Sequence, residues 1–379
     1  NIFSIDENER NRIKFGCNLI GTMVLSLIKT PFYFFPLGTL PGLIVISILA
    51  AFYGSLVGLR LIFKVIFVGP RKFFKADSHR NKPEILKNSQ YGVHKIFKLE
   101  KIKIHCVCSE RKDSQVMLFL HGFPENWFSW RYQLEHFQNE YQTVAMNLRG
   151  YGESDKPEGI ASYGIDRLVN DVFELVTILI ENTRNKKIIL VAHDWGASIA
   201  WYFAMLYPEL IEKLIIMNGT HPNAFRNQIE NDWRQFFSSW YMFFFQLPLL
   251  PELMIRSFNY EMIDKLFKKN TRNEEELEIY KYYYNSLNDL TAPLNYYRAI
   301  LRGYGRPELI EKLAHKKKSN EIEVPTLIIW GKNDNALMTD LAASSAQFCR
   351  NPTLKILDGS HWIPFEKPHE VNKLMRDFL

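Results

Sequence analysis

The stretch KIILVAHDWGA (residues 187–197) decides the fold. It begins as a short apolar run, typical of a parallel strand that is buried on both faces, and a helical pattern follows it. Small residues stand at Ala192 and Gly196, two positions on either side of Asp194. Small residues there permit the sharp strand-to-helix turn that exposes a nucleophile at the edge of a sheet. The stretch therefore predicts an α/β fold with Asp194 as its nucleophile.

From about residue 91 onward, short β-branched runs alternate with amphipathic segments, which is typical of βαβ units and a mostly parallel sheet covered on both faces. The segment 222–307 breaks this rhythm with aromatic-rich helical sequence and no clear strand. We therefore expect a core of residues 91–221 and 308–379 with a helical cap, 222–307, inserted in it. The predicted strands are 101–107, 115–120, 141–146, 187–191, 213–217, 326–330 and 353–357, and the predicted helices of the core are 164–183 and 197–206.

Two further side chains, Asp334 and His361, each follow a later strand of the predicted sheet. Active-site residues of parallel sheets gather at the carboxyl ends of the strands, and the chain order nucleophile, acid, histidine is that of the α/β-hydrolase triad. We expect His361 to be a general base and Asp334 to orient it. Asn335 and Asp340 are alternatives for the acid, and Asp358 is an alternative for supporting the histidine loop.

A carboxylate in the nucleophile position changes the class of reaction. A serine alkoxide attacks acyl carbonyls, whereas a carboxylate can displace a leaving group at a saturated carbon and form an ester that water then cleaves. We expect His361 to deprotonate that water. This role requires a neutral imidazole, whose pKa is about 6–7 when nothing perturbs it.

The loop His121-Gly-Phe-Pro124 follows another predicted strand and is expected to form one wall of the site. The backbone N–H groups of Phe123 and Trp195 are the expected oxyanion hole, because they can stabilise the anion formed when water attacks the ester. Pro124 has no N–H, so we expect it to shape the loop. We expect His121 and His193 to be structural hydrogen-bonding residues.

The composition, 47% hydrophobic and 23% charged over 379 residues, excludes a disordered or fibrous protein. The formal net charge is +6, and the segment 60–87, with eight Lys and Arg against two acids, accounts for it. Since this basic segment directly follows an apolar run, we expect membrane lipids rather than nucleic acid as its partner. Four cysteines are too few for a disulfide scaffold, and the Cys106-x-Cys108 pair has no second pair with which to hold zinc.

The segment 40–59 is a run of twenty residues without a charge, long enough to cross a hydrocarbon core of about 30 Å. It predicts a single transmembrane helix within an anchor region, residues 1–75; a buried core helix is the alternative. A shorter apolar stretch, 16–28, is expected at the membrane interface. Four basic residues precede the span and eight follow it, so the positive-inside rule places the catalytic body in the cytosol, and we expect the endoplasmic reticulum membrane.

Five segments together resemble a known family: HGFPENWFSWRYQ (121–133), LRGYGESDKP (148–157), VAHDWGA (191–197), WGKNDNAL (330–337) and GSHW (359–362). They are similar to the α/β-hydrolase-fold epoxide hydrolases, and the anchor makes the membrane-anchored animal branch, epoxide hydrolases 3 and 4, the closest likeness. The resemblance runs from about residue 99 to the C-terminus. It implies an α/β-hydrolase fold, a vicinal diol product and no cofactor or metal.

The resemblance also implies that tyrosines of the cap bind and protonate the epoxide oxygen. Tyr297, in Pro293-Leu-Asn-Tyr-Tyr297-Arg298, matches the proton-donating tyrosine. Phe244 stands where soluble members carry a second tyrosine, so either one tyrosine suffices or Tyr241 reaches in from the previous turn. The expected substrate pocket contains Pro124, Tyr241, Phe244 and Trp362.

The expected substrate is a lipophilic epoxide, with epoxy fatty acids indicated by the resemblance, and no obligate protein partner is inferred. A haloalkane or haloacid dehalogenase is the nearest alternative, because it uses the same Asp-His-Asp triad. A membrane-tethered ligand-binding protein on a retained hydrolase fold is the non-catalytic alternative, since a fold alone does not define a function.

Overall fold

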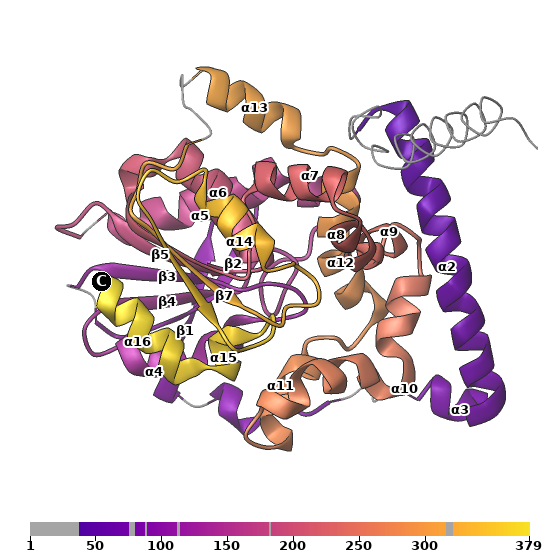
Figure 1. Ribbon diagram of the computed structural model, residues 1–379. Helices are drawn as coiled ribbons and strands as arrows, with labels where there is room; N and C mark the ends of the chain where they lie inside the picture. The colour runs from indigo at the N-terminus through magenta and orange to yellow at the C-terminus, as the bar shows by residue number, and fades with distance from the viewer. Residues whose placement is uncertain (1–37, 76–79, 88, 112–113, 182, 316–320) are drawn as a thin grey trace, which may run out of the picture.

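The structure, a computed structural model, describes residues 38–75, 80–87, 89–111, 114–181, 183–315 and 321–379. These residues form an eight-stranded sheet in the order β1-β2-β4-β3-β5-β6-β7-β8 (Figure 1). β1 and β2 are antiparallel to their neighbours, and the other strands run parallel. The strands are β1 (Val93–Lys98), β2 (Lys103–Cys108), β3 (Val116–Leu120), β4 (Gln142–Met146), β5 (Ile188–His193), β6 (Ile211–Met217), β7 (Thr326–Gly331) and β8 (Pro352–Leu357).

All seven predicted strands are present with small shifts of their ends, and β1 was missed. β1 reads VHKIFK and lies at the edge of the sheet, so only part of it is buried and its apolar signal is weak. The expectation that every strand is covered on both faces was wrong for β8. It forms the other edge of the sheet and remains largely exposed.

Helices cover both faces of the sheet (Figure 1). The two predicted core helices are present as α5 and α6, and α6 begins immediately after Asp194. The helices of the core are α4 (Arg131–Phe137), α5 (Ile165–Ile180), α6 (Trp195–Leu206), α14 (Asp340–Ala346), α15 (Ile363–Glu366) and α16 (Pro368–Phe378), with short 3-10 turns η1 (Glu84–Lys87), η2 (Ser89–Tyr91), η3 (Trp127–Trp130), η4 (Ile160–Tyr163) and η5 (Pro208–Leu210).

Between β6 and β7 the described chain is helical and contains no named strand, as the sequence predicted for this segment. α10 is kinked at residues 257–260, and the backbone N–H of Asn259 donates to Lys75 O at 2.8 Å, outside the helix. We call the following elements the helical insertion: α7 (Pro222–Asn231), α8 (Trp233–Ser238), α9 (Trp240–Phe244), α10 (Leu250–Phe267), η6 (Lys268–Asn270), α11 (Glu274–Tyr282) and α12 (Leu287–Leu301). α13 (Arg306–His315) follows the insertion.

The apolar segment near the N-terminus forms α2 (Leu40–Val68), followed by α3 (Pro70–Phe73). By length and composition α2 can cross a membrane, and most of its surface is exposed, unlike that of a buried core helix. The helix extends beyond the predicted span 40–59 as far as Val68, and Lys64 in this extension pairs with Glu261 of α10 at 2.9 Å. α2 lies along the helical insertion (Figure 1). The predicted interfacial stretch 16–28 lies outside the described residues.

Candidate active site

Asp194 stands in the predicted turn between β5 and α6. Its φ of 49° and ψ of −115° are unusual for a residue other than glycine, and neighbouring residues must leave room for such a turn. A Cβ on Gly122 would lie 2.4 Å from Asp194 Cβ, and a Cβ on Gly196 would lie 2.2 Å from Leu120 O. The two glycines therefore let this turn pack against the loop after β3.

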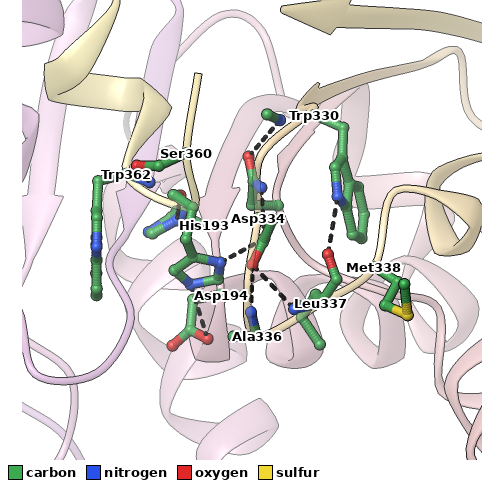
Figure 2. Close-up of polar contacts among 12 residues, drawn as sticks. His193, Asp194, Trp330, Asp334, Ala336, Leu337, Met338, Ser360 and Trp362 are labelled. Atoms are coloured by element: carbon green, nitrogen blue, oxygen red, sulfur yellow. Dashed lines mark hydrogen bonds and ion pairs between the residues drawn. The ribbon is translucent and has the colours of Figure 1, made fainter. Parts of the chain in front are cut away.

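The structure brings His361 and Asp334 together with Asp194, as the strand-end argument predicted. Figure 2 shows Asp194 and Asp334 in this site. His361 Nδ1 lies 2.6 Å from Asp334 Oδ2, and His361 Nε2 lies 3.4 Å from Asp194 Oδ2. The imidazole thus connects the two carboxylates. This arrangement can hold a base beside an ester formed on Asp194.

Asp334 is held by further hydrogen bonds. The backbone N–H groups of Ala336 and Leu337 donate to Oδ1 at 2.8 Å and 2.9 Å, and Asn218 Nδ2 donates to Oδ2 at 2.6 Å (Figure 2). Asn218 was not among the predicted site residues. Its position directly after β6, at the edge that carries the triad, is the signal by which the sequence could have revealed it.

The residues considered as alternatives for the acid, and for supporting the histidine loop, make other contacts. Asp340 pairs with Arg234 at 2.9 Å, and Asp358 accepts from Asn333 Nδ2 at 3.0 Å, both on the exposed surface. Asn335 is also exposed, and within the described chain its side chain makes no hydrogen bond to His361. The geometry thus favours Asp334 for the acid over Asn335 and Asp340, while Asp358, considered only as a support of the histidine loop, bonds to Asn333.

The three triad groups perturb one another's protonation. Burial raises the pKa of Asp194, but the hydrogen bond and the charge of His361 lower it by more than burial raises it. The net pKa therefore lies below the usual range. Burial also raises the pKa of Asp334, but His361, Leu337 N–H and Asn218 lower it by more. The net pKa of Asp334 is therefore also below the usual range. Burial lowers the pKa of His361, yet the charges of Asp334 and Asp194 raise it well above its ordinary value. The pKa of His361 therefore differs from that of an unperturbed imidazole, and the free protein favours an imidazolium between two carboxylates.

One predicted oxyanion donor already contacts the nucleophile. The N–H of Phe123 donates to Asp194 Oδ1 at 2.8 Å. Trp195 is the first residue of α6, where an N–H has no acceptor within the helix. The remaining oxygen, Oδ2, is the one nearest His361. Oδ1 is thus placed to receive amide donors while Oδ2 is placed to attack.

Two buried histidines and a glutamate hold the loops around the site. His193 Nδ1 lies 2.9 Å from Glu125 Oε2, and His193 Nε2 lies 2.8 Å from His361 O. Glu125 also accepts from Gly122 N–H at 2.7 Å. His121 bonds to Gly122 O and to Leu148 N–H. His121 and His193 are therefore structural, as expected, whereas Glu125 was not anticipated.

A cavity opens over Asp194, between α6 and the helical insertion. Tyr297 and Tyr241 both line it, and their ring centroids lie 5.8 Å apart. Burial, reinforced by the charge of Asp194, raises the pKa of each phenol, so both remain protonated near neutral pH. The lining also includes Trp195, Ser198, Tyr202 and Asp194 itself. Two phenol donors thus share a cavity with the carboxylate.

The other tyrosines considered from the sequence have different surroundings. Tyr296 OH donates to Arg149 O at 2.6 Å, and Tyr283 OH donates to Glu153 at 3.1 Å. Neither these two nor Tyr284 is among the residues that line the cavity. Their contacts are those of residues that pack the helical insertion onto the core.

The predicted pocket residues divide into two groups. Tyr241 lines the cavity, whereas Pro124, Phe244 and Trp362 are not among its lining residues. Phe244 is fully buried, 6.0 Å from the ring of Trp240 and 5.9 Å from that of Phe245. Trp362 packs on the other side of His361, against Phe267 at 5.0 Å.

One group of side chains away from this cavity has the composition of a metal site: His94, His105 and Glu153, whose ligand atoms lie within 4.8 Å of one another. Both nitrogens of His105 are already used, since Nδ1 bonds to Asn147 and Nε2 to His94, each at 2.9 Å. A metal ion would have to break this chain of hydrogen bonds. The cluster therefore fits a structural role at the β1–β2 hairpin better than a metal site.

The sheet order, the turn at Asp194 and the strand-end triad define an α/β hydrolase, and residues 115–368 match the family model described as alpha/beta hydrolase fold. The chain is 37% identical over 324 residues to epoxide hydrolase 3 of Xenopus tropicalis, covering 82% of this chain and 84% of that protein. It is 34% identical over 324 residues to human epoxide hydrolase 4, covering 82% and 85%. The chain belongs to the epoxide hydrolase family of α/β hydrolases.

A solved structure supports the same assignment. The Bacillus megaterium epoxide hydrolase, determined in complex with an inhibitor, is 32% identical to this chain and superimposes with a TM-score of 0.65. The match covers 75% of this chain and 99% of the bacterial one. A quarter of this chain lies outside the match with the bacterial structure. α2 lies before residues 115–368, which match the family model.

Proposed function

We propose that this protein hydrolyses lipophilic epoxides to vicinal diols through an ester on Asp194. The observation that carries the proposal is the pair of protonated phenols, Tyr297 and Tyr241, in the cavity that opens onto the Asp194 carboxylate. Opening an epoxide needs both a carboxylate and a phenol, since a ring carbon must be attacked and the ring oxygen must receive a proton. A serine hydrolase needs neither arrangement.

In the first step, Asp194 Oδ2 attacks a ring carbon, and the bond from that carbon to the epoxide oxygen breaks. The leaving oxygen takes a hydrogen bond from Tyr241 and a proton from Tyr297. The depressed pKa of Asp194 keeps the nucleophile ionised, while the raised pKa of Tyr297 keeps the donor protonated. The product of this step is an alkyl ester of Asp194.

In the second step, His361 removes a proton from water, and the resulting hydroxide attacks the ester carbonyl of Asp194. Phe123 N–H and Trp195 N–H stabilise the charge that develops on Oδ1. Ester formation has removed the charge of Asp194, one of the two charges that hold the His361 pKa up, so the imidazole can become the neutral base. Collapse of the anion breaks its bond to the substrate oxygen, which takes the proton of the new carboxyl group, so the diol leaves and the carboxylate is restored. The proton that His361 releases on becoming neutral returns to Tyr297, and the proton that His361 takes from water restores the imidazolium.

The helical insertion acts in this scheme as a cap, and residues 222–307 are its proposed extent, with residues 91–221 and 308–379 as the catalytic core. The cap supplies both phenols, and the core supplies the carboxylates and the imidazole. This division explains why the cavity lies where the two meet. The mechanism uses no cofactor or metal.

The position of Arg306 favours a substrate with an anionic end, such as an epoxy fatty acid. Its side chain lines the cavity, and no hydrogen bond or ion pair joins it to the described part of the chain. Burial raises the pKa of Tyr202 and the charge of Arg306 opposes this effect, so the guanidinium lies near that phenol. Trp195, Ser198 and Tyr202 line one face of α6 over about 10 Å, a length that matches several methylene groups.

Membrane association through α2 follows from its length and apolar composition. The arrangement proposed from the sequence is a single span in the endoplasmic reticulum membrane with the catalytic body in the cytosol, supported by the excess of basic residues after the apolar segment. A glycosylation acceptor inserted before Arg10 tests it. Glycosylation of that acceptor supports a lumenal N-terminus and a span, whereas an unmodified chain contradicts this orientation and fits either an inverted span or a helix held in one leaflet.

Single turnover with excess enzyme in ¹⁸O-labelled water tests the covalent mechanism. The expected result is incorporation of ¹⁸O into the Asp194 carboxylate and none in the diol, because water attacks the ester carbonyl. Asp194→Asn should abolish turnover without unfolding the protein. Label in the diol of the first turnover would contradict the ester. A bromoalkane offered in parallel distinguishes a dehalogenase, for which bromide release would exceed diol formation, and absence of any turnover would favour the ligand-binding alternative.

A further inference from the structure

α2 presents one continuous face to the helical insertion. Its buried residues recur mostly at intervals of four, which places them on one side of the helix: Gly42, Ile46, Ala50, Gly54 and Leu61. This face packs against α9 and α10. At its centre, a Cβ on Gly54 would lie 2.2 Å from Leu247 Cδ1, so Leu247 would have to move to admit a side chain there. α2 therefore approaches the cap more closely than a flexible tether would.

The contact with α9 is aromatic. The ring of Tyr53 lies 6.2 Å from that of Trp240 and is stacked 6.3 Å from that of Phe243. α9 is only five residues long, and no side chain caps its N-terminus. A helix this short has no stability of its own, so packing must hold it in place. α2 supplies part of that packing.

The opposite side of α9 faces the active site. Tyr241 and Met242 line the cavity, while their neighbours Trp240 and Phe243 contact Tyr53 of α2. A single short helix thus separates the membrane helix from the cavity. Any displacement of α9 relative to α2 displaces the phenol of Tyr241.

Polar contacts extend the docking of α2 beyond α9. Lys64 pairs with Glu261 at 2.9 Å and lies 4.7 Å from the centre of the Phe258 ring, both on α10. Farther along the chain, Lys75 O accepts from Asn259 N–H at 2.8 Å. The segment after α2 is therefore also attached to the helical insertion, and the attachment reaches the kink of α10.

The outer face of α2 is apolar and exposed, which is the surface expected to meet lipid. Its two serines donate to Leu43 O and Ala51 O of the same helix, so they bring no unpaired hydroxyl to that face. The large exposed apolar residues of α2 are Leu40, Ile44, Ile48, Phe52, Leu56, Leu59, Ile62, Phe63, Ile66, Phe67 and Val68, and Arg60 is also exposed. The helical insertion covers the inner face of α2 over residues 42–61, which a span would bring into the bilayer. This packing therefore requires α2 to lie along the membrane surface rather than to cross it as the single span proposed from the sequence, with its outer face toward lipid and its inner face toward α9.

We propose that α2 is a positioning element of the active site as well as an anchor: it holds α9 so that the phenol of Tyr241 faces Asp194. The proposal rests on the proposed epoxide hydrolysis, in which Tyr241 bonds the leaving oxygen. Tyr53 and Gly54 are its positioning residues. They touch no substrate and act through Trp240, Phe243 and Leu247.

Two glycines of α2 provide a matched test. Gly54→Leu forces a side chain into Leu247, whereas Gly58→Leu adds the same side chain where nothing lies within 4 Å. Both raise the apolar character of the helix equally. We expect Gly54→Leu to slow ester formation about tenfold in single-turnover measurements, to leave ester hydrolysis unchanged, and to leave membrane binding as in the wild type. Gly58→Leu should match the wild type in all three.

A double-variant cycle separates positioning from general loss of stability. Tyr241→Phe should slow ester formation in the wild-type background and cause little further loss with Gly54→Leu, because the phenol is then already misplaced. Fully additive losses would overturn the proposal. If Gly54→Leu fails to fold, Tyr53→Ala replaces it and Phe67→Ala, on the exposed surface of the same helix, is its control.

The outcomes also separate this inference from the proposed function. Wild-type turnover of an epoxide, lost in Asp194→Asn, supports epoxide hydrolysis whatever the α2 variants do. Equal ester-formation rates in Gly54→Leu and Gly58→Leu, measured in an active and folded enzyme, would overturn only the positioning role of α2.

Discussion

The two halves of the proposed site are held by different forces. At the sheet edge, Asp334 accepts four hydrogen bonds or ion-pair contacts, from Asn218, Ala336, Leu337 and His361. In the helical insertion, by contrast, the ring of Tyr297 lies among other rings, 5.3 Å from Phe123, 5.0 Å from Trp195 and 5.0 Å from Phe245. Hydrogen bonds fix the first half, and aromatic packing fixes the second.

This difference matches what each half must do. The imidazole requires one tautomer and one orientation, which directional hydrogen bonds specify and packing alone does not. The phenols must remain protonated and leave space for substrates, and burial among rings achieves both. We therefore expect substitutions at the sheet edge to affect ester hydrolysis, and substitutions in the insertion to affect ester formation.

The largest effect is expected for His361→Gln. Asp194 and the tyrosines remain, so the ester should form, but no base is left to activate water, and turnover should fall by about 10⁴-fold. Intact-mass measurement should show one substrate added per protein, on the peptide that contains Asp194. Asp194→Asn is the control and should gain no mass. Turnover close to that of the wild type would contradict the assignment of His361 as the base.

The next largest effect is expected for Asp334→Asn. The carboxylate raises the pKa of His361, so its removal lowers that pKa, and the acid limb of the pH profile for ester hydrolysis should move to lower pH. The maximal rate should also fall, by about 10²–10⁴-fold, because an amide favours the wrong imidazole tautomer. Asp340→Asn, at an exposed rival position, should change neither quantity. An unshifted acid limb in Asp334→Asn would show that His361 does not titrate in this step.

The same contrast explains what the sequence could predict. The triad was predictable because each member lies within four residues after the end of a strand, and parallel strands bring their carboxyl ends together. Asn218 and Glu125 were missed because they act through other side chains. The position of Asn218 directly after β6 could have pointed to it, whereas Glu125 has no such signal.

Features that depend on tertiary contacts were predicted less well. The docking of α2 on the insertion, where Lys64 pairs with Glu261 197 residues later in the chain, was not predicted from the sequence. Similarly, periodicity identified aromatic helices in 222–307 but not which side of α9 faces the cavity, since α9 carries aromatic residues on both sides. Both features are set by the packing of α2 on the insertion.

Tyr297→Phe and Tyr241→Phe should have intermediate effects. Each removes one donor to the leaving oxygen, so each should slow ester formation, about 10²-fold for Tyr297 and about 10-fold for Tyr241. Tyr297 should matter more because its ring contacts Trp195, directly beside the nucleophile. Ester hydrolysis should be unchanged in both, and Tyr282→Phe, outside the cavity lining, is the control. Equal slowing of both steps would indicate that the phenols only stabilise the fold.

The smallest effect on rate is expected for Phe244→Tyr, which places a phenol where the soluble relatives have one by resemblance. Phe244 is fully buried and does not line the cavity, so the new hydroxyl should lack a partner and destabilise the protein by about 1–3 kcal/mol without accelerating ester formation. Phe237→Tyr, at an exposed ring of α8, should leave the free energy of unfolding unchanged. Faster ester formation in Phe244→Tyr, with unchanged stability, would mean that this ring reaches the substrate. It would then remove the reason to assign the second phenol to Tyr241, one turn earlier in the same helix.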